Sequence, residues 1–243
     1  MTVTWEEAGW ERLATGVGRC RLPGWDCTVG LVVGAGSALM IDAGSSLAEG
    51  ARLRTEARAL AGHAVTHLAL THAHFDHVFG AAEFADAEVF GATGVERVLT
   101  DEREELRTDA VRNGLYARVA DEAVAALTYP RHLISDEWTL PLGDDRQVLL
   151  ANVGPGHTAH DLAVVVHDGP GSPPVVFCGD LVEESGEPQA GPDAVPPRWP
   201  AALDRLLSLG GEDALYVPGH GAVVDAAFVR AQRDALATRF GVS

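Results

Sequence analysis

The stretch Leu68-Ala69-Leu70-Thr71-His72-Ala73-His74-Phe75-Asp76-His77 decides the fold of this 243-residue chain, because an apolar run leads directly into four potential metal ligands. The apolar run is typical of a buried strand, and alternate residues of an extended segment share a face. We therefore expect His72 and His74 to point to one side of the loop, and Asp76 and His77 to another. Imidazoles and carboxylates are usual zinc ligands. The pattern predicts one loop that serves two metals.

Three further loops carry a residue of ligand type next to a glycine: His157 in 154–158, Asp180 in 178–180 and His220 in 218–221. Apolar runs that are typical of strands precede the last two, and a similar run leads to Asp42. Glycine lets the backbone turn sharply and brings a ligand close to an ion. The repeated order of strand, turn and ligand indicates a metal site built at strand ends.

In this order of motifs, from Asp42 to His220, the chain resembles the metallo-β-lactamase superfamily of hydrolases. The resemblance implies two divalent metal ions, with zinc expected and iron or manganese as alternatives. Asp180 would bridge the two metals, and Asp42 would orient a ligand histidine or its loop from behind. The implied ligands are, for the first metal, His72, His74 and His157, and for the second, Asp76, His77 and His220.

The resemblance also implies an α/β fold, the four-layer αββα sandwich, with the site at one edge of two paired sheets. Residues 1–243 are expected to form a single domain with a helical insertion near 91–127, which either covers part of the pocket or packs on the flank. A helix over 47–60 is expected to begin at Ser46 and stop at Gly62. The other expected elements are strands at 14–20, 27–33, 38–41, 66–70, 147–153, 162–167 and 174–178, and helices at 201–209 and 226–240.

The charge balance argues against nucleic-acid and membrane partners. The chain has 18 basic and 35 acidic residues, a formal net charge of −17, and such a field repels phosphate backbones and anionic lipid surfaces. The first residues show no basic start followed by an apolar segment, and no run approaches the length of a membrane span. We expect a cytoplasmic protein with reduced cysteines that acts on a small molecule. The sequence does not indicate an oligomeric state.

These features predict a dinuclear metal-dependent hydrolase that cleaves an ester, thioester or lactone with a hydroxide bridging the metals. Asp76 and Asp180 are the expected catalytic carboxylates; Asp76 would orient the hydroxide. The ligand set resembles that of glyoxalase II, whereas the residues after His220 do not resemble its glutathione-binding region. Three alternatives remain open: a mononuclear iron persulfide dioxygenase, a β-lactamase, and a metal-binding regulatory protein without catalysis. A bridging aspartate is generally absent from the β-lactamases of the superfamily, which disfavours that alternative.

Two residues are candidate substrate contacts. Trp25 lies at the tip of the turn between the first two expected strands, and packing against the sandwich is an equal alternative for its side chain. His160 follows His157 on the same loop, and a structural role is the favoured alternative. Beyond Asp180, the acidic segment 183–187 would repel anionic substrates or hold a cationic group, unless it is only a solvated loop.

Overall fold

The first sheet leads the chain into the histidine cluster. The computed structural model describes residues 3–169 and 171–242. Strands β1 to β4 pair antiparallel and β4 to β7 pair parallel, so the segments that follow β4 and β5 leave the sheet at the same edge. The strands lie in chain order: β1 (Glu11–Ala14), β2 (Val17–Arg21), β3 (Thr28–Val33), β4 (Ala38–Ile41), β5 (His67–Ala69), β6 (Glu88–Ala92) and β7 (His132–Ile134).

The second sheet contributes the remaining strand-borne residues of the site. Its β11 and β12 run parallel, its other neighbours run antiparallel, and β11 is buried over its whole length. An isolated bridge between Cys27 and His220 joins the two sheets at the site edge. In spatial order the strands are β12 (Leu215–His220), β11 (Val175–Glu183), β10 (Leu162–Val166), β9 (Gln147–Asn152) and β8 (Glu137–Pro141).

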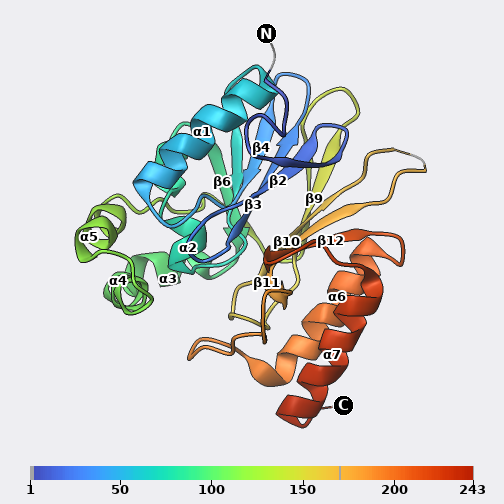
Figure 1. Ribbon diagram of the computed structural model, residues 1–243. Coiled ribbons are helices and arrows are strands. Elements are labelled where there is room, and N and C mark those ends of the chain that lie inside the picture. The colour runs from blue at the N-terminus through green and yellow to red at the C-terminus, as the bar shows by residue number, and fades with distance from the viewer. Residues whose placement is uncertain (1–2, 170, 243) are drawn as a thin grey trace.

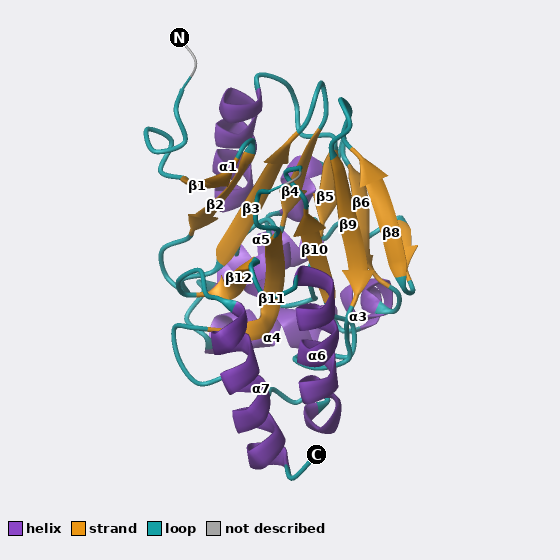
Figure 2. Cartoon of the chain, turned by 90° about the vertical axis from the view of Figure 1, so that its right-hand side faces the viewer, coloured by secondary structure: helices purple, strands orange, loops and turns teal. Residues whose placement is uncertain are grey.

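Helices cover the outer faces of both sheets (Figure 1). The first sheet is covered by α1 (Leu47–Ala61), the short α2 (Phe75–Val78) and η1 (Ala81–Phe84), with the insertion helices α3 (Val95–Asp101), α4 (Arg103–Arg112) and α5 (Ala117–Ala125) beside them. Figure 2 shows α6 (Trp199–Gly210), which follows η2 (Pro196–Arg198), and α7 (Ala226–Phe240) in front of the second sheet. None of the helices in the described ranges combines the length and the apolar character needed to cross a bilayer.

Three apolar clusters separate the four layers. Adjacent residues of β5 divide between them, because Leu68 packs toward the helices of the first layer and Ala69 packs between the sheets. The inter-sheet cluster also contains Phe177, and the third cluster buries Leu203 of α6 against the second sheet. Each fully buried leucine or phenylalanine stabilises the fold by roughly 1.5–3 kcal/mol. The αββα sandwich predicted from the sequence is confirmed.

Local structure differs from the sequence-based prediction at the first strand and at the start of the insertion, and β6, β7 and β8 were not predicted. The strand expected over 14–20 is a hairpin, because Gly16 adopts a φ of 64° and reverses the chain between β1 and β2. Residue 91, where the helical insertion was expected to begin, lies in β6, and the insertion starts with α3. The first helix begins and ends at the predicted caps: at its start the Ser46 side chain accepts from the amide of Glu49, and at its end Gly62 is left-handed.

Candidate metal centre

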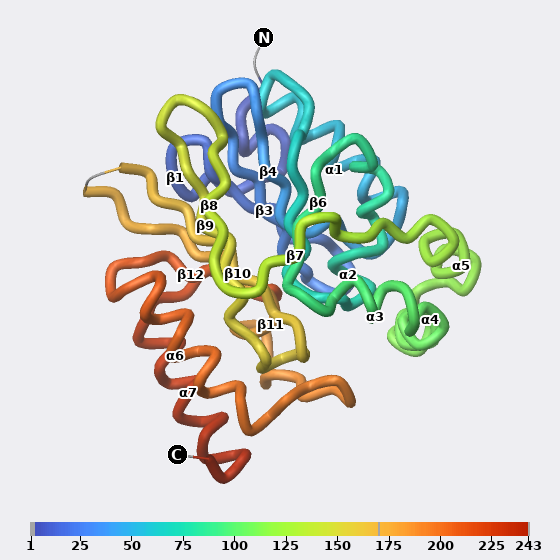
Figure 3. Tube along the Cα trace, turned by 180° about the vertical axis from the view of Figure 1, so that it is seen from behind, coloured from blue at the N-terminus to red at the C-terminus, as the bar shows by residue number. Residues whose placement is uncertain are grey.

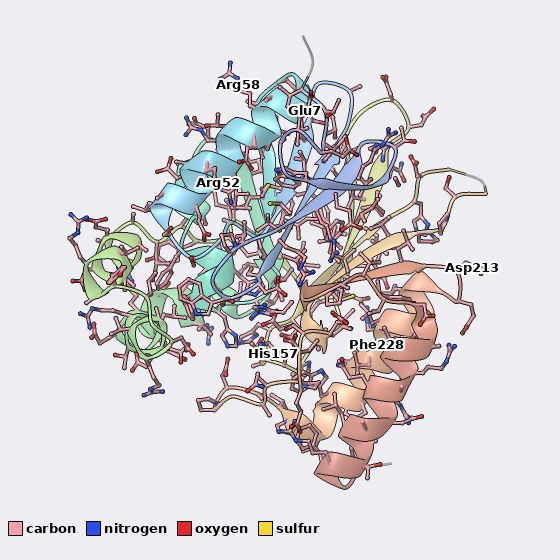
Figure 4. All side chains as sticks on the ribbon, in the orientation of Figure 1. Glu7, Arg52, Arg58, His157, Asp213 and Phe228 are labelled. Atoms are coloured by element: carbon pink, nitrogen blue, oxygen red, sulfur yellow. The ribbon has the colours of Figure 1, made fainter. Side chains whose placement is uncertain are left out.

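Four side chains from three segments form a first group with the composition of a metal site. His72 and His74 come from the loop after β5, His157 from the loop after β9 and Asp180 from β11, and one ligand atom of each lies within 4.8 Å of the others. His74 Nδ1 lies 3.0 Å from His157 Nε2. Nε2 of His72 and Nε2 of His157 each lie 3.5 Å from Asp180 Oδ2. Figure 4 labels His157 where the strands meet the α6–α7 pair.

A second group shares Asp180 with the first. It joins His77, Asp180 and His220: His77 Nε2 lies 3.1 Å from Asp180 Oδ1, and His220 Nε2 lies 3.2 Å from Asp180 Oδ2. Asp76 borders this group, with its Oδ2 3.4 Å from His220 Nε2 and 3.7 Å from His77 Nε2. The structure therefore brings together all seven residues that the sequence analysis named as metal ligands, with Asp180 between the two groups.

Gly219 permits this close packing. A Cβ atom built at Gly219 would lie 1.8 Å from Asp180 Oδ1, a separation that no side chain tolerates. The glycine before His220 is thus required because the backbone of β12 passes directly against the shared carboxylate.

The imidazole orientations follow one rule. In each of the five clustered histidines, one ring nitrogen contacts an oxygen outside the cluster, so the other ring nitrogen faces inward. The outer partners are Thr71 Oγ1 for His72 (3.0 Å), Asp193 Oδ2 for His74 (3.0 Å), Asp42 Oδ2 for His77 (2.8 Å), the Gln189 carbonyl for His157 (3.1 Å) and the Trp25 carbonyl for His220 (2.7 Å).

Asp42 supports one histidine of each group. Its Oδ1 accepts from the Thr71 amide at 2.8 Å, and its Oδ2 accepts from Thr71 Oγ1 at 2.7 Å and from His77 Nδ1 at 2.8 Å. Because Thr71 Oγ1 donates to Asp42, it is free to accept from His72 Nδ1. Asp42 therefore contacts a ligand-type histidine and the loop that carries the cluster, in the position expected from the sequence.

The electrostatics of the cluster favour a bound cation. Burial lowers the pKa of His72 well below its usual range and lowers the pKa of His157 to about 4. Both imidazoles are therefore neutral at pH 7, the form that binds a metal ion. Burial acts the same way on His220, but the Asp180 carboxylate outweighs it and raises that pKa to about 9. Burial opposes ionisation of Asp180, yet the surrounding imidazoles, His77 first, hold its pKa well below the usual range. The centre holds an ionised carboxylate that attracts positive charge.

Two buried atoms test whether a metal fits these residues. His72 Nε2 and Asp180 Oδ1 have no hydrogen-bond partner in the described part of the chain, although these residues are only 1% and 8% exposed. An unsatisfied buried polar atom costs about 1–3 kcal/mol. A divalent cation would satisfy both atoms, and nitrogen and carboxylate donors suit zinc, iron and manganese. The residues present fit the metals that the sequence implies.

Cys27 borders the second group and was not expected there. Its Sγ lies 3.2 Å from the Asp76 carbonyl and 3.7 Å from either ring nitrogen of His77, and the three residues could themselves hold an ion. Burial raises the pKa of the Cys27 thiol, which keeps it protonated at neutral pH. The one sequence feature that could have indicated this position is that Cys27 lies close to the Trp25 turn. All three cysteines are free and buried.

Asp193 is a second residue that the sequence analysis missed. It lies in the proline-rich segment between β11 and α6, 119 residues from its partner, and its Oδ2 accepts from His74 Nε2 at 3.0 Å. The contact orients His74 so that Nδ1 faces His157. No local pattern around Asp193 marks it, because only the fold brings this segment to the histidine loop.

Asp193→Ala is expected to lower metal affinity about 10–100-fold, the usual effect of removing a carboxylate behind a ligand histidine. Competition with a chromophoric chelator measures the affinity, and thermal unfolding of the metal-free protein checks the fold. Asp193→Asn keeps an acceptor oxygen and should lose less. An affinity unchanged in both variants would contradict a positioning role for Asp193.

The two expected substrate contacts lie in different surroundings. Trp25 lines the cavity and packs edge-to-face on Phe75, with the ring centroids 5.2 Å apart. Its Nε1–H donates to the Asn113 carbonyl at 3.2 Å. His160 does not line the cavity: its ring occupies the space beside Gly94, where a Cβ would lie 2.1 Å from it. The loop thus turns the His160 side chain toward the start of α3, and a substrate contact for His160 stays a prediction.

A cavity of about 1110 Å³ opens over both groups. Its walls come from the Trp25 turn, from α4 and from the loop after β11, which reaches toward the α4 side of the molecule in Figures 1 and 3. Asp76, His74, His157, Asp180 and His220 lie at its base. The insertion therefore covers part of the pocket, as one of the two sequence-based interpretations required.

Comparison with known proteins assigns the family. The model of the metallo-beta-lactamase superfamily matches residues 22–220, and the chain belongs to this superfamily. It is 31% identical over 158 residues to a hydroxyacylglutathione hydrolase of Cupriavidus metallidurans, covering 64% of this chain and 50% of that protein. It is 29% identical over 159 residues to metallo-beta-lactamase domain-containing protein 1 of Xenopus laevis, covering 65% and 54%. The chain spans about half the length of these curated relatives.

Solved structures share the fold. The DIM-1 metallo-beta-lactamase superposes with a TM-score of 0.71 at 18% identity, covering 95% of this chain and 97% of that one. A metallo-beta-lactamase from Hirschia baltica gives a TM-score of 0.66 at 17% identity, covering 93% and 96%. At these identities the likeness extends to the fold alone.

Proposed function

We propose that this protein is a dinuclear metal-dependent hydrolase that cleaves an ester, thioester or lactone. One observation carries the proposal: Asp180 belongs to two ligand groups at once, at the base of a cavity large enough for a small molecule. Zinc is the proposed metal, with iron and manganese as alternatives. The proposed ligands are His72, His74 and His157 for one metal and Asp76, His77 and His220 for the other, with Asp180 between them.

Metals held there supply a water of lowered pKa and polarise the substrate carbonyl. The residues of the chain hold this chemistry in place. Asp180 sets the separation of the two ligand groups, and Asp76, which is buried but lines the cavity, is proposed to orient the attacking hydroxide. Cys27 is no candidate nucleophile, because its thiol is buried and donates to the Asp76 carbonyl.

The relatives support acyl hydrolysis rather than any single substrate. One sequence relative carries the name hydroxyacylglutathione hydrolase. The family model is that of the metallo-beta-lactamase superfamily, and the solved structures are metallo-beta-lactamases. A carboxylate shared by two ligand groups favours the ester, thioester and lactone hydrolases over β-lactam cleavage. The strong net negative charge supports a small-molecule substrate instead of a nucleic acid.

Metal analysis combined with a substrate panel tests the proposal. Protein purified without chelator should contain two transition-metal equivalents per chain and hydrolyse members of an ester, thioester and lactone series. The same panel should include a cephalosporin and glutathione persulfide. One iron with oxygen consumption on the persulfide would instead establish a dioxygenase, and preferential cephalosporin cleavage a β-lactamase. Bound metal without turnover of any compound would establish a non-catalytic protein.

Trp25→Ala is expected to lower kcat/KM for the best substrate about tenfold, because removal of a large apolar contact costs roughly 1–3 kcal/mol in transition-state binding. The backbone carbonyl that holds His220 is retained, so metal content should not change. Trp25→Phe keeps the aromatic contact and should lose less. Trp138→Ala, at a half-exposed tryptophan outside the cavity, is the control. A fall in Tm with unaltered kinetics would identify Trp25 as a packing residue.

A further inference from the structure

The cavity walls carry an excess of negative charge beyond the metal-ligand residues. Among the described residues that line the cavity, Arg112 is the one arginine or lysine. The carboxylates outside the ligand groups are Glu102, Glu104, Glu105, Asp109, Glu183, Glu187 and Asp193. The guanidinium of Arg112 offsets one of them, and Arg107 and Arg239, outside the lining, pair with Glu104 and Glu187. The walls still carry an excess of carboxylates.

One side of this wall is left without counter-ions. Glu102 directly precedes α4, and Glu105 and Asp109 lie within it; because the three are spaced by three and four residues, they lie on the same side of the helix. In the described part of the chain, none of the three lies within 4.0 Å of a basic group, whereas the neighbouring Glu104 pairs with Arg107 at 3.1 Å. Three uncompensated carboxylates thus face the same space.

Other features of the cavity indicate that it holds a ligand. Asp180 is 8% exposed, lines the same cavity and keeps its Oδ1 unpartnered. Trp25, which donates to the Asn113 carbonyl directly after α4, and Phe75 add an aromatic wall beside the acidic one, and aromatic rings attract organic cations as well as apolar groups. A concave, acidic surface focuses its field on whatever enters. A carboxylate- or phosphate-bearing acyl compound would be repelled at the rim.

We propose that the cavity selects a substrate with a positively charged nitrogen, an ammonium or quaternary ammonium group, in the acyl or the leaving part, and disfavours anionic thioesters such as those of glutathione. The charged nitrogen would lie against the adjoining walls of α4 and the Trp25–Phe75 pair while the carbonyl faces the metal centre. This inference rests on the proposed hydrolase function for its chemistry, but its charge preference is measurable by binding alone.

Three 4-nitrophenyl esters test the preference: those of 4-(trimethylammonio)butanoate and 5,5-dimethylhexanoate, an isosteric cationic and neutral pair, and the anionic monoester of glutarate. The cationic ester should have a kcat/KM about tenfold above the neutral one, because the attraction of three partly screened carboxylates amounts to roughly one decade, and the anionic ester should rank last. High salt should reduce the difference. The triple variant Glu102→Gln, Glu105→Gln, Asp109→Asn should bring the cationic-to-neutral ratio close to one.

A matched control removes the same charge elsewhere: Asp101→Asn, Glu122→Gln, Asp213→Asn, three exposed positions outside the cavity lining. This variant should keep the ratio. A ratio that is near one in the wild type, or that survives the α4 triple variant, would overturn the proposal while leaving the hydrolase intact.

Calorimetric binding of the corresponding 4-nitroanilides separates the inference from the function. The cationic anilide should bind about tenfold tighter than the neutral one, and the α4 triple variant should abolish that difference. If this result is obtained but no ester is hydrolysed in a metal-dependent way, the hydrolase proposal fails and the charge selection stands. Equal binding of the cationic and neutral anilides would refute the charge selection irrespective of turnover.

Discussion

Asp180→Ala is expected to remove at least one metal equivalent per chain and to lower kcat/KM about 1000-fold or more. Metal stabilisation of a transition state is worth several kcal/mol, and each 1.4 kcal/mol is about tenfold in rate. The variant also leaves His72, His77, His157 and His220 facing one another without the shared carboxylate. Metal analysis and single-substrate kinetics on the best panel compound measure both effects.

Asp168→Ala is the matched control, since Asp168 is a largely buried carboxylate paired with Arg146 at 2.9 Å, outside the cavity lining. Its loss should lower the free energy of unfolding and leave metal content unchanged. Full metal content with undiminished activity in Asp180→Ala would exclude Asp180 from the site. His72→Ala should be at least as damaging, because it removes a buried donor that no other residue replaces.

The ligand-type residues were predictable because each is placed by local sequence. Four of them lie within the six residues 72–77 and the others follow a strand or lie beside a glycine, so the local pattern marks them as candidates, and the family resemblance divides them between two metals. The family resemblance then supplies the order of the layers. Nothing local, however, predicts that Asp193 approaches His74 or that Cys27 approaches His77, because these contacts depend on how two sheets and a proline-rich loop pack.

Other differences between the sequence analysis and the structure have the same origin. His160 has the polarity and position of a pocket residue, but its ring lies beside Gly94 at the start of α3. The short strands β7 and β8 were missed because their outward faces are exposed and polar or aromatic, as at Trp138, so they lack the apolar run that marked β10 and β11. Trp25 fits both of its interpretations, as a substrate contact and as a packing residue, because its side chain packs against the apolar core and also lines the cavity.

Asp42 is the residue whose loss should affect the fold and the metal centre together. Asp42→Ala leaves the buried Thr71 amide and hydroxyl and His77 Nδ1 without their acceptor. Removing one partner of a buried, hydrogen-bonded charge typically costs about 3–5 kcal/mol. The backbone adds to this, because Asp42 has a φ of 58°, a conformation that aspartate and asparagine tolerate better than alanine.

Asp42→Asn separates the two effects. Asparagine accepts the left-handed backbone and keeps one carbonyl oxygen for the Thr71 amide, but its NH2 group cannot accept from Thr71 Oγ1 or His77 Nδ1. We therefore expect Asp42→Asn to lose less stability than Asp42→Ala, while metal affinity falls about 10–100-fold, the usual effect of losing an orienting carboxylate. Chemical denaturation of the metal-free proteins and chelator competition measure the two quantities. Wild-type metal affinity in Asp42→Asn would mean that the carboxylate serves the loop alone and does not orient His77 and His72.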